Sequence, residues 1–441
     1  MESELKKPAL GFLIPEFKVQ SEKVSFAYGR PNMRVQFLRG TVWGLTKEQI
    51  RKQIIENVNA ITGQPMMSEA IAKLTTQLTS AEMDMSEKKQ DIGPETYTDT
   101  EDNLHKLFLD KRYTDFLPIT LPTRERVDAM LEQTSHDPDE HLATMNPGSV
   151  AGEDWKYTVR HAAIAAVMAG AKPEYFPVIL AIGSTGQTAL NVTDNGIMYG
   201  VIINGKIRDE IGLNYDVGAV GPYAHANTTI GRAWSLLSIN GGNCGKVGTT
   251  YMGTVGNPMN LINVIIAENE DNSPWEPFSV QRGYKKDENI VTLLRGWGIL
   301  SAKNWNITDS SPTPNYARIV QGIHRQQSPG QGTIAVLSPP IANLIHDNGY
   351  ATVEKFIEYV KEPDPNAKPK TPAKPKADAK PKVEAKPKAA PAKPRADQPV
   401  ILRASGAGGA VTVVVTGASN NNYWMMGGMG PTQSVQIDPW R

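Results

Sequence analysis

The stretch INVIIAENEDNSPWEPF, residues 262–278, places acidic side chains directly after an apolar run. Glu268 and Glu270 are two residues apart, so they would share one side of a strand that continued through them. Two carboxylates held together can act as general acid and general base, or bind a divalent cation through oxygen. Trp275 lies between two prolines, which would stiffen the backbone and make this side chain a wall of a substrate site. The alternative is a solvated loop in which acids end a strand.

A second polar stretch, NGKIRDEIGLNYDVGAVGPYAHANTTIGRA, could bind an anion. Asn227 and the two threonines after it are predicted to cap a helix, and a helix N-terminus that follows a glycine-bearing loop favours anions. His225 is also a candidate catalytic group. The alternative is an ordinary connection with a capped helix. The groups predicted to hold or orient an anionic substrate are Arg208, His225, Arg232, Asn227 and Asn269.

The only cysteine, Cys244, lies in the glycine-rich stretch 238–260. Lys246 is close enough in sequence to lower the pKa of the thiol, so Cys244 is a candidate nucleophile. The alternative is a small residue in a closely packed segment. A single cysteine excludes an internal disulfide and a cysteine-based zinc site, and the seven histidines show no HExxH spacing. Neither GxGxxG nor a P-loop is present, so no nucleotide site is predicted.

The composition indicates a globular protein with no attraction for nucleic acid. Among 441 residues, 46 are Lys or Arg and 46 are Asp or Glu, and 40% are hydrophobic. This balance gives no overall field that would recruit nucleic acid or an acidic membrane. The first residues contain no apolar run of signal-peptide length, and no segment reaches about 18 consecutive apolar residues. We therefore expect a cytoplasmic protein.

The arrangement of apolar runs predicts an α/β fold. Residues 1–150 form a helix-rich section, in which Thr46 is predicted to cap a helix. From residue 151, short apolar runs bounded by glycine alternate with helical patterns, which favours a mixed or mainly parallel sheet covered by helices. The predicted strands are IMYGVIING, MNLINVIIAE, NIVTLL and GTIAVL, and the predicted helices between and after them include TTIGRAWSLLSI, PPIANLIHDNG and TVEKFIEYVKE.

Residues 362–398 interrupt this pattern with an AKPK repeat. Proline at this density blocks helices, so a disordered, extended tether is predicted. The apolar run VTVVV at residues 411–415 follows it. Because one strand cannot fold alone, this run should complete the preceding sheet. The α/β core domain is therefore predicted to comprise residues 151–361 and 399–441.

Several segments carry a family resemblance: VRHAAIAAVMAGAKPEYFPVILA, IINGKIRDEIGLN, GPYAHANTTIGRAWSLLSINGG, GNPMNLINVIIAENEDNSPWEPFSVQRGY and VTVVVTGA. They resemble a bacterial family of soluble proteins associated with UGSC-type (seleno)proteins. The resemblance covers residues 150–361 and the final strand, and it implies a shared fold and a shared site. Thiol redox chemistry is associated with that family, but the resemblance brings no established reaction to this chain. This chain departs from the family pattern by having His225 in place of arginine and by lacking a U/C-G-S-C motif.

These patterns lead to one main functional hypothesis and two alternatives. The main hypothesis is a lyase or hydrolase that cleaves or hydrates a small polar or anionic molecule, with Glu268 and Glu270 as acid and base. It would use no organic cofactor, with or without a divalent metal. The alternatives are a redox component that works with a thiol or selenol partner protein, and a non-catalytic scaffold. The predicted partners are a small-molecule substrate and either further copies of the chain or a partner subunit.

Overall fold

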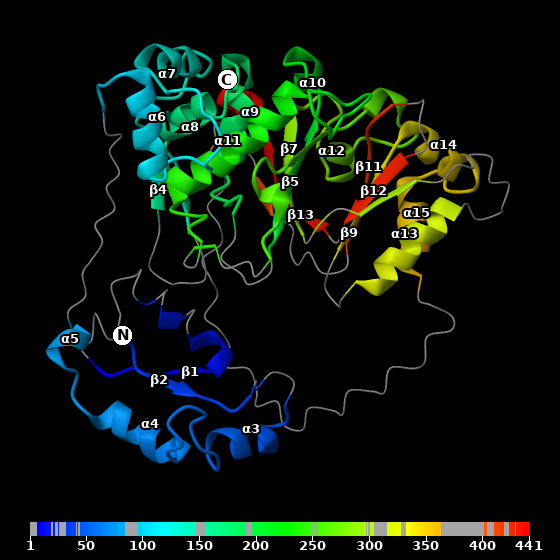
Figure 1. Cartoon of the computed structure of the whole chain (residues 1–441). Coiled ribbons are helices and arrows are strands. Elements are labelled where there is room, and N and C mark those ends of the chain that lie inside the picture. Colours follow the sequence, from blue (N-terminus) through cyan, green and yellow to red (C-terminus); the bar gives the residue numbers. More distant parts are fainter. Residues whose placement is uncertain are drawn as a thin grey trace, which may run out of the picture. The chain divides into compact units, whose positions relative to one another are not determined.

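The structure is a computed structural model of the whole chain (Figure 1). It describes residues 7–18, 21–22, 25, 32–40, 42, 45–83, 96–146, 155–190, 196–247, 250–251, 255–296, 298, 300–303, 315–327, 332–362, 401–403, 410–418, 423–427 and 429–441. The chain divides into two compact units. One consists of Met1–Gly93 and Gly245–Met252, and the other of Pro94–Cys244 and Gly253–Arg441. Residues 94–150, which the sequence grouped with the front section, belong to the second unit, and the AKPK repeat lies outside the described residues.

The first unit combines a small parallel sheet with short helices. Its strands are β1 (Gly11–Leu13) and β2 (Val35–Phe37), and its helices are the 3-10 helix η1 (Pro15–Phe17), α3 (Lys47–Ile54), α4 (Met66–Thr75) and α5 (Ser80–Met83). The predicted cap of α3 is confirmed. The Thr46 hydroxyl accepts the Gln49 N–H at 3.3 Å, and the Gln49 side chain accepts the Thr46 N–H at 2.9 Å. This reciprocal pair satisfies two N–H groups that a helix start leaves free.

The second unit contains a five-stranded mixed sheet in the order β10-β13-β7-β5-β6. β5 runs parallel to β6, and the other neighbouring strands are antiparallel. The strands β5, β6 and β7 coincide with three of the predicted runs. Their bounds are β5 (Met198–Asn204), β6 (Val264–Ala267), β7 (Ile290–Gly296), β10 (Ile401–Arg403) and β13 (Met429–Gln436).

A four-stranded sheet in the order β11-β9-β12-β8 lies in the same unit. Its strands are β8 (Leu300–Lys303), β9 (Thr333–Leu337), β11 (Val411–Val415) and β12 (Tyr423–Gly427). β11 pairs in parallel with β9 over its whole length, so the final apolar run does complete a sheet with a strand that precedes the repeat. A separate antiparallel pair consists of β3 (His141–Met145) and β4 (Trp155–Thr158).

Helices cover both sheets, which confirms the predicted α/β class. They are α6 (Glu101–Asp110), α7 (Arg124–Leu131), α8 (Val159–Met168), α9 (Phe176–Gly183), α10 (Ile207–Glu210), α11 (His225–Gly242), α12 (Phe278–Gln281), α13 (Asn315–Gln326), α14 (Pro339–Asp347) and α15 (Val353–Lys361), with 3-10 helices η2 (Pro173–Tyr175), η3 (Pro258–Asn260), η4 (Glu270–Asn272) and η5 (Asp438–Trp440). In Figure 1, α8, α9 and α11 lie on one side of the strands and α13, α14 and α15 on the other.

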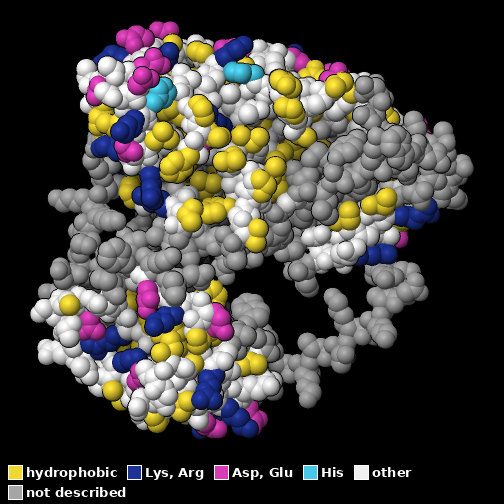
Figure 2. Space-filling model, viewed as in Figure 1, with side chains coloured by type: hydrophobic (Ala, Val, Ile, Leu, Met, Phe, Trp, Pro, Cys, Tyr) yellow, Lys and Arg dark blue, Asp and Glu magenta, His cyan; other side chains and the backbone are white. Residues whose placement is uncertain are grey.

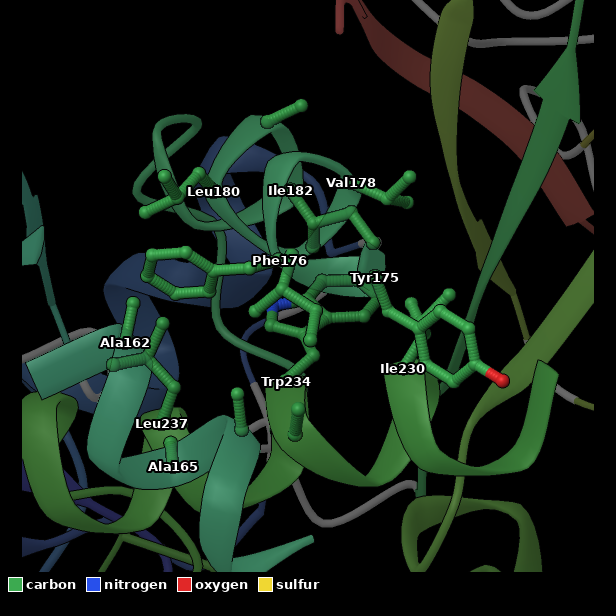
Figure 3. Packing of buried hydrophobic residues seen from close by; sticks show 14 of the residues in the cluster. Ala162, Ala165, Tyr175, Phe176, Val178, Leu180, Ile182, Ile230, Trp234 and Leu237 are labelled. Atoms are coloured by element: carbon green, nitrogen blue, oxygen red, sulfur yellow. The ribbon is translucent and has the colours of Figure 1, made fainter. Parts of the chain in front are cut away.

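Three apolar clusters show that the two sheets pack face to face. The outer face of the five-stranded sheet packs against α8, α9 and α11, where Phe176 and Trp234 are fully buried (Figure 3). The outer face of the four-stranded sheet packs against α13, α14 and α15. Alternate residues of both sheets, such as Ile202 and Val336, form a third cluster between them. Since strand side chains alternate between faces, the unit has four layers, with a helical layer outside each sheet.

The surface carries charges of both signs. On the face seen in Figure 2, Lys and Arg side chains lie interspersed with Asp and Glu side chains among the residues shown in colour. Within the described part of the chain, no helix has the length and apolar character needed to cross a membrane.

Candidate functional site

The candidate site lies where β5 and β6 end. Asn204 is the last residue of β5, and Glu268 directly follows β6. The two strands are parallel, so their carboxyl ends meet at one edge, and the Glu268 N–H donates to the Ile203 carbonyl at 3.1 Å. Every residue of β6 is buried, as the continuous apolar run predicted. The carboxyl group of Glu268 therefore lies in the interior, directly after a buried strand. α/β proteins commonly bind ligands at the carboxyl ends of their strands.

Glu268 is a buried carboxyl group with an unusual protonation equilibrium. Only 1% of the residue is exposed. One of its oxygens, Oε2, accepts hydrogen bonds from the Asn204 side-chain amide and, at 2.7 Å, from the Phe278 N–H. Burial raises the pKa of Glu268 to about 7, and the neighbouring Glu270 contributes to this rise, while the donors at Asn204 and Phe278 oppose it. The carboxyl therefore exists in both protonation states near neutral pH.

Glu270 joins Glu268 through a turn. The strand ends at Ala267, and Glu270 begins the 3-10 helix η4, so the two side chains do not meet by the alternation of a continued strand. The two side chains share a donor instead: Asn204 Nδ2 donates to Glu268 Oε2 and, at 3.0 Å, to Glu270 Oε1. The same oxygen accepts the Gly205 N–H at 2.8 Å. One amide group thus links the carboxyl pair, which we define as Glu268 and Glu270.

Arg208, predicted to hold an anionic substrate, is a cation that pairs with Glu270. Its Nε atom lies 3.4 Å from Glu270 Oε1, and both side chains are largely buried, with exposed fractions of 4% and 6%. The guanidinium also donates to two backbone carbonyls, those of Gly205 at 2.8 Å and of Glu268. Its other neighbour is the Tyr215 ring, whose centroid lies 4.9 Å from Cζ. The guanidinium of Arg208 therefore binds groups of the protein itself. It connects Glu270 with the backbone carbonyls of Gly205 and Glu268.

Asn269 fastens the site to the second sheet. Its N–H donates to the Val415 carbonyl at 2.7 Å, and its side-chain amide donates to the Gly417 carbonyl at 3.1 Å. Beside it, the Thr416 hydroxyl donates to the Ala267 carbonyl at 2.7 Å. These bonds join the end of β6 to the end of β11. Asn269, predicted to orient a substrate, orients the two strand ends in this structure.

Asn227 and Arg232 also have partners within the protein. α11 starts at His225, so Asn227 lies inside the helix and the predicted cap is wrong. Its side chain accepts the Asn214 N–H at 2.9 Å and donates to the Ile265 carbonyl at 3.3 Å, which fixes a loop against β6. Arg232 forms a two-bond ion pair with Asp115, at 2.9 and 2.8 Å. Among the described contacts, none brings Arg232 to the carboxyl pair.

His225 and Trp275 are not joined to the carboxyl pair by any described contact. His225 is exposed, and its Nδ1 lies 3.4 Å from the Tyr175 hydroxyl. Trp275 is buried in the cluster outside the second sheet, where its ring stacks on Phe356 with centroids 5.9 Å apart. Its indole N–H donates to the Tyr350 carbonyl at 2.9 Å. The tryptophan between prolines therefore anchors the segment after the carboxyl pair to the second core, instead of forming a wall of a substrate site.

Cys244 is fully buried at the far end of α11. Its sulfur accepts a hydrogen bond from the Thr188 hydroxyl at 3.1 Å and donates to the Gly242 carbonyl at 3.2 Å. The helix between Asn227, next to β6, and Gly242 spans about 23 Å at the usual rise per residue. The structure thus separates the thiol from the carboxyl pair, and it favours a packing role.

The sequence prediction missed Asn204, which makes the shortest link between the two carboxyls. Asn204 ends the run IMYGVIIN, just as Glu268 follows the run of β6, so polar residues at the ends of adjacent parallel strands could have revealed it. The Phe278 N–H was also missed, because a backbone donor has no sequence signature. The side-chain oxygen of Asn204 is buried and has no hydrogen-bond partner within the described ranges of the chain.

The described residues contain no group of three or more His, Cys, Asp or Glu side chains arranged to hold a metal ion. Within the carboxyl pair, Asn204 donates to Glu268 Oε2, and both Asn204 and Gly205 donate to Glu270 Oε1. The divalent metal remains an untested prediction.

The fold and the site define a four-layer α/β protein with a buried carboxyl pair at the junction of its two sheets. Comparison of the chain with protein-family models, curated proteins and solved structures finds no match. The resemblance to the UGSC-associated family therefore stays a prediction.

Proposed function

We propose that the chain is an enzyme that cleaves or hydrates a small polar molecule, with Glu268 as the group that takes up and releases a proton. The observation that carries this proposal is the protonation equilibrium of Glu268. Its pKa of about 7 is the value at which a side chain can act as base and as acid at neutral pH. A buried carboxyl with a raised pKa beside a second, ion-paired carboxyl is a common arrangement for acid–base chemistry.

The groups around Glu268 have complementary roles in this proposal. Asn204 and the Phe278 N–H donate to Oε2, so they stabilise the ionised form of the carboxyl. Glu270, paired with Arg208, keeps a negative charge near Glu268 and so favours the protonated form. Because these influences oppose one another, the pKa of Glu268 lies near neutral pH. A substrate would give its proton to Glu268 in one step and receive a proton from it in the next.

The redox alternative has less support. Its sequence candidate, Cys244, is fully buried and hydrogen-bonded to Thr188 and Gly242. A reactive thiol needs access and a thiolate-stabilising environment. The scaffold alternative depends on the front section and the AKPK repeat, and no contact of the described residues favours it over the carboxyl pair.

A solvent-exchange screen over several classes of small molecule tests the proposal. The full chain would be incubated in D2O with small hydroxy acids, unsaturated acids, amides and lactones, and proton NMR would follow conversion or deuterium uptake. We expect Glu268→Gln to lower the rate for any active compound by at least about 100-fold, the usual contribution of a general acid–base group. Circular dichroism and a cooperative melting curve would establish that the variant is folded.

Glu276→Gln is the matched control, because Glu276 is an exposed glutamate in the same segment. This variant should keep the full rate. Equal rates for wild type and Glu268→Gln, or no conversion of any compound in the screen, would contradict the proposal.

A further inference from the structure

A second polar cluster lies on the inner face of the five-stranded sheet. Thr292 of β7 and Ser434 of β13 face each other in register, with their hydroxyl oxygens 2.8 Å apart, and both residues are fully buried. Thr292 lies opposite Ile202 of β5, which belongs to the apolar cluster between the sheets. Two adjacent hydroxyls thus interrupt an apolar face, which is costly unless they have a polar partner.

Arg282 supplies that partner. It directly follows α12, and its Nε donates to the Ser434 hydroxyl at 2.8 Å. The guanidinium lies over the Phe278 ring, 6.0 Å from its centroid. Among the described residues, no carboxylate pairs with Arg282, in contrast to Arg208 and Arg232. The side chain is half-buried, and burial lowers the pKa of Arg282, an effect that Tyr284 opposes.

Hydrogen-bond donors outnumber acceptors in this cluster. Whichever of Thr292 and Ser434 donates to the other, one hydroxyl proton of the pair has no acceptor within the cluster. The Ser279 hydroxyl, three residues before Arg282 in sequence, is buried and has no hydrogen-bond partner among the residues that the structure describes. The guanidinium also has further N–H groups beyond its Nε, and they make no hydrogen bond within the described part of the chain. Buried polar groups in native proteins nearly always find partners, so these donors point to an absent acceptor.

We propose that Ser279, Arg282, Thr292 and Ser434, the Arg282 cluster, bind an oxyanion, either a carboxylate or a phosphate group. An oxyanion offers several acceptor sites and one or two negative charges, which match the surplus donors and the unpaired cation. Guanidinium groups bind both kinds of anion through two parallel N–H bonds. The proposal goes beyond the proposed function, because anion binding does not require proton transfer at Glu268.

The cluster and the carboxyl pair share one short segment. The Phe278 N–H holds Glu268, and the Phe278 ring lies under the guanidinium of Arg282. A molecule whose anionic end binds the cluster would therefore contact residues of α12 or next to it. The first residue of this single helical turn, Phe278, also binds Glu268. Neither Arg208 nor Arg232 can take this role without giving up its own carboxylate.

Isothermal titration calorimetry with the full chain tests the inference directly. Sodium phosphate and sodium malonate would be titrated separately, with ionic strength held constant by chloride. We expect wild type to bind at least one of them, and Arg282→Met to bind it at least about tenfold more weakly, a loss of about 1.4 kcal/mol. Methionine keeps an apolar stem over Phe278 while removing charge and donors. Arg124→Met, at an exposed arginine of α7, is the matched control and should bind as wild type does.

Ser279→Ala provides a second variant that should fold without difficulty. Removing a buried hydroxyl that lacks a partner should raise the melting temperature in the absence of anion and weaken anion binding several-fold. Binding of phosphate alone would identify phosphate compounds as ligands, and binding of malonate alone would identify carboxylates. Unchanged affinity in Arg282→Met, or no binding of either anion at millimolar concentration, would overturn the proposal. No turnover is measured, so this result is independent of the proton-transfer test.

Discussion

Replacing Glu268 by glutamine should remove a specific dependence of stability on pH. The carboxyl has an ordinary pKa of 4.5 when the chain is unfolded and about 7 when it is folded. Between these values the unfolded chain loses the proton while the folded protein keeps it, so the folded state loses relative stability as pH rises. This contribution is fully present below pH 4.5 and lost once the pH has risen through about 7. The difference between the two pKa values corresponds to about 3 kcal/mol.

Urea denaturation of wild type and Glu268→Gln at a series of pH values from about 4 to about 8 measures this contribution. Tryptophan fluorescence is a suitable probe, because all but one of the eight tryptophans belong to the second unit. We expect the free energy of unfolding of wild type, taken relative to the variant, to fall by about 3 kcal/mol across this range. A stability cost of the substitution that does not depend on pH leaves the change with pH unaffected. Groups that titrate elsewhere in the chain contribute equally to both proteins, so they cancel when the variant is subtracted from wild type.

The control is again Glu276→Gln, whose pH profile should follow that of wild type. A difference between wild type and Glu268→Gln that stays constant within about 1 kcal/mol across the same pH range would refute the raised pKa. It would also remove the observation on which the proposed function depends.

Two further predictions concern α11 and Cys244, which lies two residues after its end. Gly231→Ala should destabilise the second unit by about 3 kcal/mol or more, because the added carbon would overlap the Ile262 carbonyl oxygen, and overpacking against backbone is costly. An unchanged melting temperature would contradict the close contact between the helix and the segment before β6. Cys244 should react with a soluble thiol reagent only after denaturation, because it is fully buried. Rapid stoichiometric labelling of the native protein would instead revive the redox alternative.

Much of the fold could be predicted because its strands are continuous apolar runs. β5, β6, β7 and β9 are buried on both faces, so their sequences carry no polar alternation that could be confused with helical spacing. That the run at residues 411–415 joins a strand that precedes the repeat could also be predicted, since an isolated apolar strand needs a neighbour. Its particular partner, β9, could not. The face-to-face packing of two sheets could not be predicted, because a strand that is buried on both sides does not reveal what covers each side.

The positions of the candidate site residues could be predicted only where local rules determine them. Glu268 was expected at the end of a strand because it directly follows a continuous apolar run, and the structure places it there. Arg232 was misjudged because its partner Asp115 lies 117 positions earlier, in a loop without distinctive pattern. Trp275 was misjudged because its neighbours in sequence are two prolines and a glutamate, whereas its neighbours in space, such as Phe356, form a core. Long-range partners decide whether an arginine or a tryptophan is available to a ligand, and one sequence does not give them.

The bonds that join β6 to β11 also determine when the site can form. Thr416 and Ala267, which share a hydrogen bond, are 149 positions apart, and Asn269 depends on Val415 and Gly417 in the same way. Because a ribosome makes the chain from its N-terminus, Glu268 is synthesised long before the strand that closes over its neighbours. Until β11 emerges, Ala267 and Asn269 lack the partners that fix the end of β6. The strand end that carries the carboxyl pair is therefore fixed only when one of the last segments of the chain has been made.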